Sequence, residues 1–476
     1  MKPNKERLPL NETLNALPTE WQEDPLPAIK CLLEDLSKKI VVLDDDPIGT
    51  QTIREVAVLT EYSVERLTEE LSSASPAFFI LTNTRSMSAA EAYSTVWEIS
   101  NNLTKASIAA DMDFLIVIRS DSTLRGHFYE EIQAVRDGSG KDFDGCIFAP
   151  FFLEGGRFTI EDNHYVREGE WLTPASDTEF ATDSSFPFST SHIPTYIEEK
   201  TKADISAASV NMISLSHFRL EGPEKVAQIL SSLSSNDMCG VNATAMRDME
   251  LLAQAYLTVT KKRILVRTSA SFIRALLGQS ESQILGAEVL VNDNKMGGLI
   301  VIGSHVPRST CQMQHLLENN HRLVPVEIDV SKLLDQKENH SEISRVRLLL
   351  TKILVSGSDA VLFTSRTLIS GDSHSSNLEI GAQISSSLSE LVRSLRVCPN
   401  FMVLKGGSTA SRIALDGLNI KRAWAIGQAA PGVPTWQLGQ EAKFPNLSLI
   451  IFPGNVGHVD SLTTLISDLQ EHIRKA

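Results

Sequence analysis

The sequence has few cysteines and no long apolar segment. Among its 476 residues there are 5 cysteines, and no two of them form a C-x-x-C pair. This spacing excludes a cysteine zinc knuckle and argues against a disulfide framework, so we predict a reducing, cytoplasmic compartment. The longest apolar runs, such as Phe114–Ile118 and Leu447–Phe452, have the length of a strand. They fall far short of the ~20 residues that a membrane helix needs.

Positive charge is also scarce. Lys and Arg total 44 against 59 Asp and Glu, which gives a formal net charge of −15. Such an acidic surface argues against sequence-independent binding of nucleic acid and against docking on anionic lipid. An anionic ligand would need a local cluster of Arg, Lys and backbone N–H groups that works against the overall field. The sequence contains no Walker A loop, G-x-x-x-x-G-K-[ST].

The chain does contain a regular alternation of short β-branched runs and longer helical patterns. Lys38–Leu43, Ala77–Thr82, Phe114–Ile118 and Gly145–Pro150 have the pattern of buried parallel strands, with helix candidates between them. A second series of the same kind starts at Leu299. This alternation predicts an α/β protein of two domains, each a largely parallel sheet covered by helices.

The predicted domain boundaries follow changes in this rhythm. We expect an N-terminal extension over residues 1–37, a first domain over 38–278, a polar linker over 279–298 and a second domain over 299–476. The extension lacks the apolar core of a secretory signal. Residues 154–201 have no long periodicity, and a loop of that length is either functional or contains short strands.

Three carboxylates, Asp44, Asp45 and Asp46, directly follow the first predicted strand. Carboxylates this close together repel unless they bind a cation, share a proton or accept N–H bonds, and one could act as a general base. A simple capping cluster is the structural alternative. The segment also resembles the D-x-D-x-T nucleophile loop of the haloacid-dehalogenase phosphatases at Asp44 and Asp46, but Ile48 stands where that loop requires Thr.

Arginines and hydroxyls follow the next predicted strands. Arg85 comes after the second strand, and the run Arg119-Ser120-Asp121-Ser122-Thr123-Leu124-Arg125-Gly126-His127 comes after the third. A guanidinium fork matches both oxygens of a carboxylate, and small polar groups beside a helix start suit a polyhydroxylated anion. A surface ion pair at Arg85 and an elaborate helix cap after Arg119 are the alternatives.

Turns rich in glycine follow three strands of the second series. They are Gly427-Gln428-Ala429-Ala430-Pro431-Gly432-Val433-Pro434, Gly406-Gly407-Ser408-Thr409 and Pro453-Gly454-Asn455-Val456-Gly457, and a Gly-Ser pair, Gly303-Ser304, ends a further strand. Paired glycines allow close backbone approach, and N–H groups at such turns can hold phosphate. Ordinary βα turns have the same composition. The second turn also lies one residue from a nucleophile elbow, so a hydrolase that uses Ser408 stays open.

Taken in order, these segments resemble the four-carbon acid sugar kinase family. The similarity is carried by Asp45–Gly49, Thr82–Arg85, Arg119–Gly126, Gly156–Thr159, Gly406–Thr409 and Pro453–Gly457. It runs from about Lys38 to the C-terminus. Two positions depart from the family pattern: Ile48 replaces a Thr, and Phe452 stands where many relatives carry a Lys.

The resemblance implies an ATP-dependent kinase with its active site in an interdomain cleft. The N-terminal domain would hold a small-molecule four-carbon sugar acid, such as a tetronate or 3-oxo-tetronate, the C-terminal domain would hold ATP with Mg²⁺, and the product would be the 4-phosphate. Its matching positions imply catalytic roles for Asp45 and Asp46. They imply contacts with the acid at Arg85, Arg119, Asp121, Ser122, Arg125 and Arg157. They imply contacts with ATP at Ser304, Gly406, Gly407, Ser408, Thr409, Gly454 and Gly457.

Several points stay open from the sequence. It identifies no metal ligands, and it leaves both a monomer and a homo-oligomer open. The rival functions are a hydrolase that uses Ser408 or Asp44, and a catalytically silent relative that binds a metabolite. The silent relative is suggested by Ile48 and Phe452.

Overall fold

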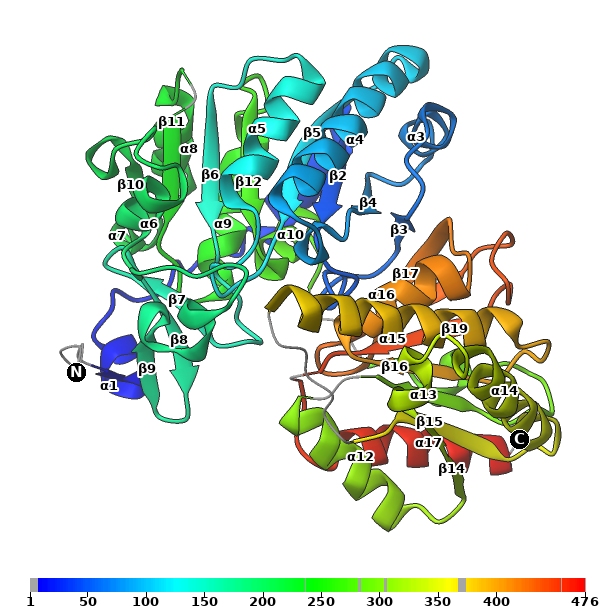
Figure 1. Cartoon of the computed structure of the whole chain (residues 1–476). Coiled ribbons are helices and arrows are strands. Elements are labelled where there is room, and N and C mark those ends of the chain that lie inside the picture. Colours follow the sequence, from blue (N-terminus) through cyan, green and yellow to red (C-terminus); the bar gives the residue numbers. More distant parts are fainter. Residues whose placement is uncertain are drawn as a thin grey trace. The chain divides into compact units, whose positions relative to one another are not determined.

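The computed structural model describes residues 7–235, 237–280, 284–303, 306–366, 374–454 and 456–475. It consists of two compact units (Figure 1). Unit 1 comprises Met1–Asp45 and Tyr62–Glu281, and unit 2 comprises Asp46–Glu61 and Ser282–Ala476. Residues 46–61 therefore belong to unit 2, although the residues before and after them belong to unit 1. The predicted ranges 38–278 and 299–476 place this segment in the first domain. Those ranges stay predictions.

The main sheet of unit 1 has the strand order β10-β11-β6-β12-β5-β2-β4. Every neighbouring pair in it is parallel. The strands are β2 (Lys38–Asp44), β4 (Ala77–Leu81), β5 (Asp113–Arg119), β6 (Gly145–Ala149), β10 (Asn211–Ile213), β11 (Asp237–Val241) and β12 (Ile264–Thr268). Their side chains are almost all buried, as expected for a sheet covered on both faces.

Helices cover both faces of this sheet (Figure 1). On one face α3 (Val64–Leu71), α4 (Ala89–Ala110) and α5 (Phe128–Ser139) pack side by side. The other helices of unit 1 include α2 (Leu26–Glu34), α6 (Ile193–Lys200), α7 (Leu215–Arg219), α8 (Gly222–Ser232), α9 (Met246–Thr258) and α10 (Ala270–Leu276), of which α2, α7, α8 and α10 contact α9. Helix α4 begins where Ser88 and Glu91 form a capping box.

The irregular stretch after β6 contains a small antiparallel sheet. Strands β7 (Arg157–Ile160), β8 (Asn163–Glu168) and β9 (Trp171–Pro174) follow one another, and β1 (Leu8–Pro9) pairs with β9. Of the two alternatives for this stretch, the presence of short strands is therefore confirmed. The pairing of β1, which precedes α1 (Leu10–Asn15), also fixes the N-terminal segment on unit 1.

Unit 2 contains a mixed sheet with the order β3-β17-β18-β19-β16-β13-β15-β14. The pairs from β3 to β19 are antiparallel and those from β19 to β14 are parallel. The strands are β3 (Val56–Leu59), β13 (Leu299–Ile302), β14 (Leu323–Ile328), β15 (Asp359–Thr364), β16 (Met402–Lys405), β17 (Arg422–Ala430), β18 (Val433–Leu438) and β19 (Ser448–Phe452).

The helices of unit 2 also lie on both faces of its sheet (Figure 1). Helix α12 (Pro307–Asn319) packs against α17 (Ser461–Lys475), and α13 (Val330–Leu334) and α14 (Asn339–Val355) pack against α15 (His374–Ser394). The shorter α11 (Ala287–Leu290) and α16 (Gly407–Arg412) complete the set. A buried apolar cluster that includes Ile300, Val403 and Ile450 forms the core between the sheet and α12 and α17. The predicted α/β class is confirmed.

In the part of the chain that the structure describes, no helix has both the length and the apolar character that crossing a bilayer requires.

Candidate functional site

The carboxyl ends of β2 and β5 bring two aspartates and two arginines together in unit 1. Asp44 is in register with Arg119, and Asp45 follows directly. Arg85, which comes after β4, donates to Asp45 through Nε (3.1 Å) and Nη2 (2.7 Å). Arg119 Nη1 lies 3.4 Å from Oδ1 of both Asp44 and Asp45. Guanidinium groups thus offset the repulsion between the two carboxylates.

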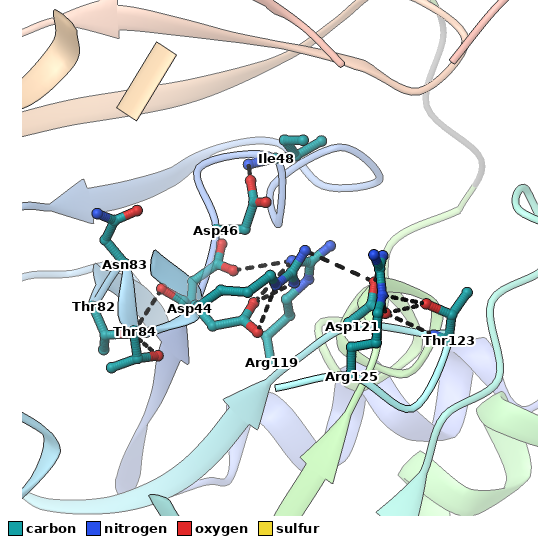
Figure 2. Close-up of polar contacts among 12 residues, drawn as sticks. Asp44, Asp46, Ile48, Thr82, Asn83, Thr84, Arg119, Asp121, Thr123 and Arg125 are labelled. Carbon is teal, nitrogen blue, oxygen red and sulfur yellow. Dashed lines mark hydrogen bonds and ion pairs between the residues drawn. The ribbon is translucent and has the colours of Figure 1, made fainter. Parts of the chain in front are cut away.

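A second carboxylate–arginine cluster lies on the loop after β5, and Figure 2 shows it beside Arg119. Asp121 accepts from Arg125 Nε at 2.9 Å and from the Thr123 amide at 3.2 Å, and it lies 3.8 Å from Arg85 Nη1. Burial opposes ionisation of Asp121, but Arg125 and Arg85 outweigh it and hold the pKa of this carboxyl far below its usual value. The Arg85 guanidinium therefore lies within ion-pair distance of both clusters.

Two arginines lie over one phenylalanine ring at the edge of this cluster. The guanidinium carbon of Arg125 is 4.9 Å and that of Arg157 is 5.6 Å from the centre of the Phe180 ring. Arg125 Nη1 also reaches Asp183 at 3.3 Å. Arg157 donates to the Gly155 carbonyl, but its buried Nε has no partner among the described residues. Burial lowers the pKa of the Arg157 guanidinium, and no carboxylate is paired with it in the described part of the chain.

Buried groups that the sequence analysis did not single out hold the loop after β5 in place. His164 on β8 is fully buried, and its Nε2 bonds the Ser122 carbonyl at 2.8 Å while Thr159 bonds its Nδ1 at 2.9 Å. Burial lowers the pKa of His164 to about 4, so the ring is neutral at pH 7 and donates to Ser122. The Tyr196 hydroxyl donates to the Leu124 carbonyl at 2.8 Å.

Beneath this loop, Arg267 on β12 pairs with Glu131 on α5 at 2.5 Å. Glu131 also accepts from Thr84 at 2.5 Å, so one buried ion pair connects three elements of unit 1. Gly126 has a φ of +110°, a conformation that favours glycine, and an added Cβ there would lie 3.4 Å from Arg267 Nη2. The partners lie far apart in the sequence, and no local motif pointed to them.

In unit 2, Asp46 lies against the turn between β16 and α16. Its Oδ1 accepts from the Ile48 amide at 2.9 Å. A Cβ added at Gly407 would lie 3.3 Å from Asp46 Oδ2 and 3.2 Å from Ile48 Cδ1. Gly406 has a φ of +110°, which again favours glycine. The carboxylate of Asp46 and the side chain of Ile48 therefore occupy the space in front of the paired glycines.

The turns after β13, β16 and β19 start at the same level of the sheet. Lys405 is in register with Ile302 on one side and with Phe452 on the other. Thr409 lies close to Gly303, since a Cβ added at Gly303 would be 2.4 Å from Thr409 Oγ1. At the third turn, Ser309 donates to the Gly454 carbonyl at 3.1 Å. Gln312 donates to the Val456 carbonyl at 3.0 Å.

The comparisons with known proteins identify both halves of the chain. Residues 40–276 match the model of a sugar-binding N-terminal domain, and residues 299–462 match that of a nucleotide-binding C-terminal domain. Together these two models cover most of the chain and occur in the predicted order. The chain belongs to the four-carbon acid sugar kinase family.

This family consists of small-molecule phosphotransferases, and one curated relative is the D-erythronate kinase of Heliobacterium modesticaldum (strain ATCC 51547 / Ice1). The chain is 28% identical to it over 277 residues, which span 56% of this chain and only 56% of that kinase.

Two solved structures have a similar fold. One, from Salmonella typhimurium LT2 and provisionally described as a tRNA synthase, has a TM-score of 0.64 at 15% identity, and the match covers 91% of this chain and 99% of that protein's chain. Haemophilus influenzae protein HI1011 has a TM-score of 0.62 at 16% identity and covers 90% and 99%. At these identities the two structures show the fold alone.

The family's predicted site residues fall into two groups in the structure. Unit 1 brings Asp45, Arg85, Arg119, Asp121, Ser122 and Arg125 together, with Arg157 next to Phe180. Unit 2 brings Asp46 next to Gly406 and Gly407, and places Thr409 near Gly303 and Gly454 near Ser309. Gly457 lies in the same turn as Gly454, and Ser461 Cβ would be 2.9 Å from a Cβ there. Ser304 and the side chain of Ser408 lie outside the described residues.

No group of three or more His, Cys, Asp or Glu side chains suited to a metal ion occurs in the described part of the chain. Magnesium that accompanies a nucleotide needs only one or two protein carboxylates, because phosphates and water supply the other ligands. Asp46, next to the glycine turn, fits such a role. Asp45 fits it less well, because Arg85 and Arg119 already occupy its carboxylate.

Proposed function

We propose that this protein is an ATP-dependent kinase that phosphorylates the terminal C4 hydroxyl of a four-carbon sugar acid, such as a tetronate or a 3-oxo-tetronate. The observation that carries the proposal is the arginine cluster at the carboxyl edge of the parallel sheet of unit 1. It stands in a sugar-binding domain of a chain whose other domain is a nucleotide-binding domain. D-Erythronate, which the H. modesticaldum relative is named for, is the first substrate to test.

Recognition of the carboxylate is assigned to Arg85, Arg125 and Arg157. Arg157 supports this best, because its half-buried guanidinium, whose Nε is fully buried, lacks a carboxylate partner in the described residues and lies beside Arg125 at the Phe180 ring. A carboxylate ligand would supply the missing negative charge and accept two parallel N–H bonds. Arg119 is buried between Asp44 and Asp45, so we assign it a positioning role rather than a contact with the acid. Asp121 and Ser122 would position Arg125 and the loop.

The phosphoryl transfer itself is assigned to the aspartates that follow β2. The C4 oxygen attacks the γ-phosphorus, the bond from that phosphorus to the β-phosphate oxygen breaks, and ADP leaves. The hydroxyl proton passes to a carboxylate, for which Asp46 and Asp45 are the candidates. Since Asp45 is held by two arginines of unit 1 and Asp46 lies at the glycine turn of unit 2, the two sites are linked by one peptide bond. Their Cα atoms are about 3.8 Å apart in any arrangement of the units.

This linkage leads us to propose that the acid and the nucleotide meet at the Asp45–Asp46 peptide, in a cleft between the domains that closes on both ligands. Closure would exclude water, which otherwise competes with the C4 hydroxyl as acceptor. The turns at Gly406–Thr409 and at Gly454 and Gly457, with Ser304, would hold the triphosphate. Mg²⁺, when bound with ATP, would neutralise charge on the transferred phosphoryl group.

The test is a coupled ADP-release assay with the full chain across tetronates and 3-oxo-tetronates. We expect turnover of at least one acid and none of erythritol, which has the terminal hydroxyls but no carboxylate. Folded protein that releases no ADP with any of these acids would contradict the proposal. Arg157→Gln should raise the KM of the acid, and the matched control is Arg167→Gln, since Arg167 on β8 is exposed and reaches only the Gly169 carbonyl among the described groups.

The rival functions make different predictions. A hydrolase should gain no thermal stability from magnesium-ATP, whereas the kinase should. Asp44 is also a poor nucleophile, because it is buried and lies 3.4 Å from Arg119. A silent metabolite-binding relative should be stabilised by a tetronate without turning it over, and Ile48→Thr should then raise activity sharply.

A further inference from the structure

A buried lysine lies at the base of the three turns of unit 2. Lys405 is the last residue of β16, the middle strand of β13, β16 and β19, and its side chain is fully buried. On either side, Ile302 and Phe452 occupy the same register position. The turns that follow these three residues are the ones assigned above to the triphosphate. The Lys405 side chain therefore starts at the centre of that edge of the sheet.

The ammonium group of Lys405 has little to balance its charge. Its Nζ donates to the Pro453 carbonyl at 3.1 Å and lies 4.2 Å from the centre of the Phe452 ring. An ammonium has three N–H donors, and among the described residues one carbonyl and one aromatic face contact it. No carboxylate forms an ion pair with Lys405 within the described ranges; the charge that acts on it there is the like charge of Arg308, at the start of α12.

A buried, uncompensated ammonium destabilises a folded protein unless an anion accompanies it. Burial together with Arg308 lowers the pKa of Lys405 to about 7. The pKa is low because no nearby negative charge among the described residues stabilises the protonated form. A lysine kept only for packing could be replaced by an apolar side chain of similar length without this cost. Lys405 lies at the carboxyl ends of three adjacent strands, and the turns that follow them contain the glycines that commonly hold phosphate.

We propose that Lys405 supplies the positive charge that holds a nucleotide phosphate at the turns after β13, β16 and β19. This rests on the proposed function only in taking the ligand to be a nucleotide. The glycine turns would contribute N–H groups and shape, and Lys405, with Arg308 at the start of α12, would contribute the charge that backbone dipoles alone lack. In a buried site this attraction is stronger than it is between exposed groups.

The experiment compares Lys405→Met with wild type in the full chain. Methionine keeps the length of the side chain and removes the charge. We expect the KM and Kd of magnesium-ATP to rise roughly tenfold or more, with the KM of the sugar acid changed less than twofold. Lys405→Arg should recover part of the nucleotide affinity. A Lys405→Met variant that binds magnesium-ATP as tightly as wild type would overturn the proposal.

The matched control is Lys443→Met. Lys443 is a half-buried lysine of unit 2 whose ammonium, like that of Lys405, lies over an aromatic ring, Phe444, at 5.1 Å, and burial also lowers its pKa. It lies with Asp416 and Glu441 around a separate hollow. We expect no change in nucleotide binding. A loss of affinity equal to that of Lys405→Met would mean that any buried lysine of this unit has the same effect, and would also overturn the proposal.

A second measurement needs no variant, in case Lys405→Met does not fold. Calorimetric titration of wild type with magnesium-ATP at pH 8, in buffers of different ionisation enthalpy, should reveal proton uptake, because phosphate raises the proton affinity of a lysine that is mostly neutral there. Among the described residues, Arg308 is the charge that acts on Lys405, and the Asp46 carboxylate lies against Gly407 in the next turn. The residues at 302–303, 452–453 and 406–411 carry no group that titrates near this pH. Binding without proton uptake would contradict the proposal. No binding at all by wild type would instead refute the kinase function itself.

Discussion

The two units hold charge in opposite ways. At the carboxyl edge of unit 1, guanidinium and carboxylate groups alternate: Arg85 pairs with Asp45, Arg119 lies between Asp44 and Asp45, and Arg125 pairs with Asp121. At the corresponding edge of unit 2, backbone turns predominate, and the central side chain is a lysine without a carboxylate partner in the described part of the chain.

Because of this difference, substitutions in the two units should affect different properties of the protein. A side chain of unit 1 is held by charged neighbours, so its removal leaves a buried charge unpaired and affects stability as well as binding. The turns of unit 2 are made of backbone, so few substitutions can reach them, and those that do should act on nucleotide binding with little effect on stability.

The largest contrast should be between the consecutive residues Asp45 and Asp46. Asp45→Asn removes the carboxylate that Arg85 contacts most closely and one of the two that contact Arg119, and it should cost about 3 kcal/mol of unfolding free energy. Asp46→Asn keeps the shape of the side chain and an oxygen for the Ile48 amide, so it should cost less stability than Asp45→Asn. If Asp46 is the general base, the kcat of the Asp46→Asn variant should fall roughly 10²- to 10⁴-fold. Chemical denaturation and ADP release measure the two effects, and equal destabilisation by both variants would remove the contrast.

The pH dependence of stability should depend on His164 in unit 1. Burial lowers its pKa from 6.5 to about 4, so the neutral form stabilises the fold above pH 6.5, and this contribution is lost as the pH falls toward 4. Wild type should therefore lose about 3 kcal/mol more than His164→Asn over that interval. Urea unfolding of both proteins from pH 4 to 7 measures it. Parallel pH curves would show that His164 is not buried in the neutral form.

Arg125→Gln should separate the two units in steady-state kinetics. The variant loses the bonds to Asp121 and Asp183, and we expect kcat/KM for the sugar acid to fall roughly 10- to 100-fold while the KM of magnesium-ATP changes little. Arg167→Gln, an exposed arginine of the same unit, is the control. An equal loss for both substrates would mean that the two sites are not divided between the units as we propose.

The smallest expected effect concerns the space in front of the paired glycines. Gly407→Ala would place a Cβ 3.2 Å from Ile48 Cδ1, and we expect the KM of magnesium-ATP to rise about threefold from this crowding. Ile48→Val removes that methyl group and should recover part of the loss in the double variant. Gly381→Ala on α15 is the control, because an added Cβ there meets nothing within 4 Å. Additive effects of the two changes would show that Ile48 and Gly407 are not in contact.

The sequence predicts the parts of the fold that leave a local pattern. The predicted strands Lys38–Leu43 and Phe114–Ile118 correspond to β2 and β5, and α4 is one of the helices expected between the strands. Strand β3 escaped prediction because Val56–Leu59 is short, and its place is set by β17, which lies more than 350 residues later. Strand β14 was missed because its burial alternates, as at an edge of the sheet.

The same distinction applies to the candidate site. Asp45, Arg85 and Arg125 could be named from the sequence because each follows a strand within a polar run. His164, Arg267 and Glu131 could not be named in this way. Each is a single polar residue in an apolar or irregular segment, and its role becomes visible only when the fold shows which residue it contacts. The same holds for Lys405: a lysine at the end of an apolar strand is usually exposed, and only the fold shows that this one is buried between two other strands.

The exchange of the segment 46–61 means that the polypeptide passes between the two units three times, at residues 45–46, 61–62 and 281–282. No single cut can therefore release either half intact. A chain truncated to begin at residue 282 would lack β3 and leave the edge of β17 with unsatisfied N–H and C=O groups, which invites aggregation. Adding residues 46–61 as a separate peptide should restore solubility, and that complementation would make the nucleotide-binding half accessible by itself.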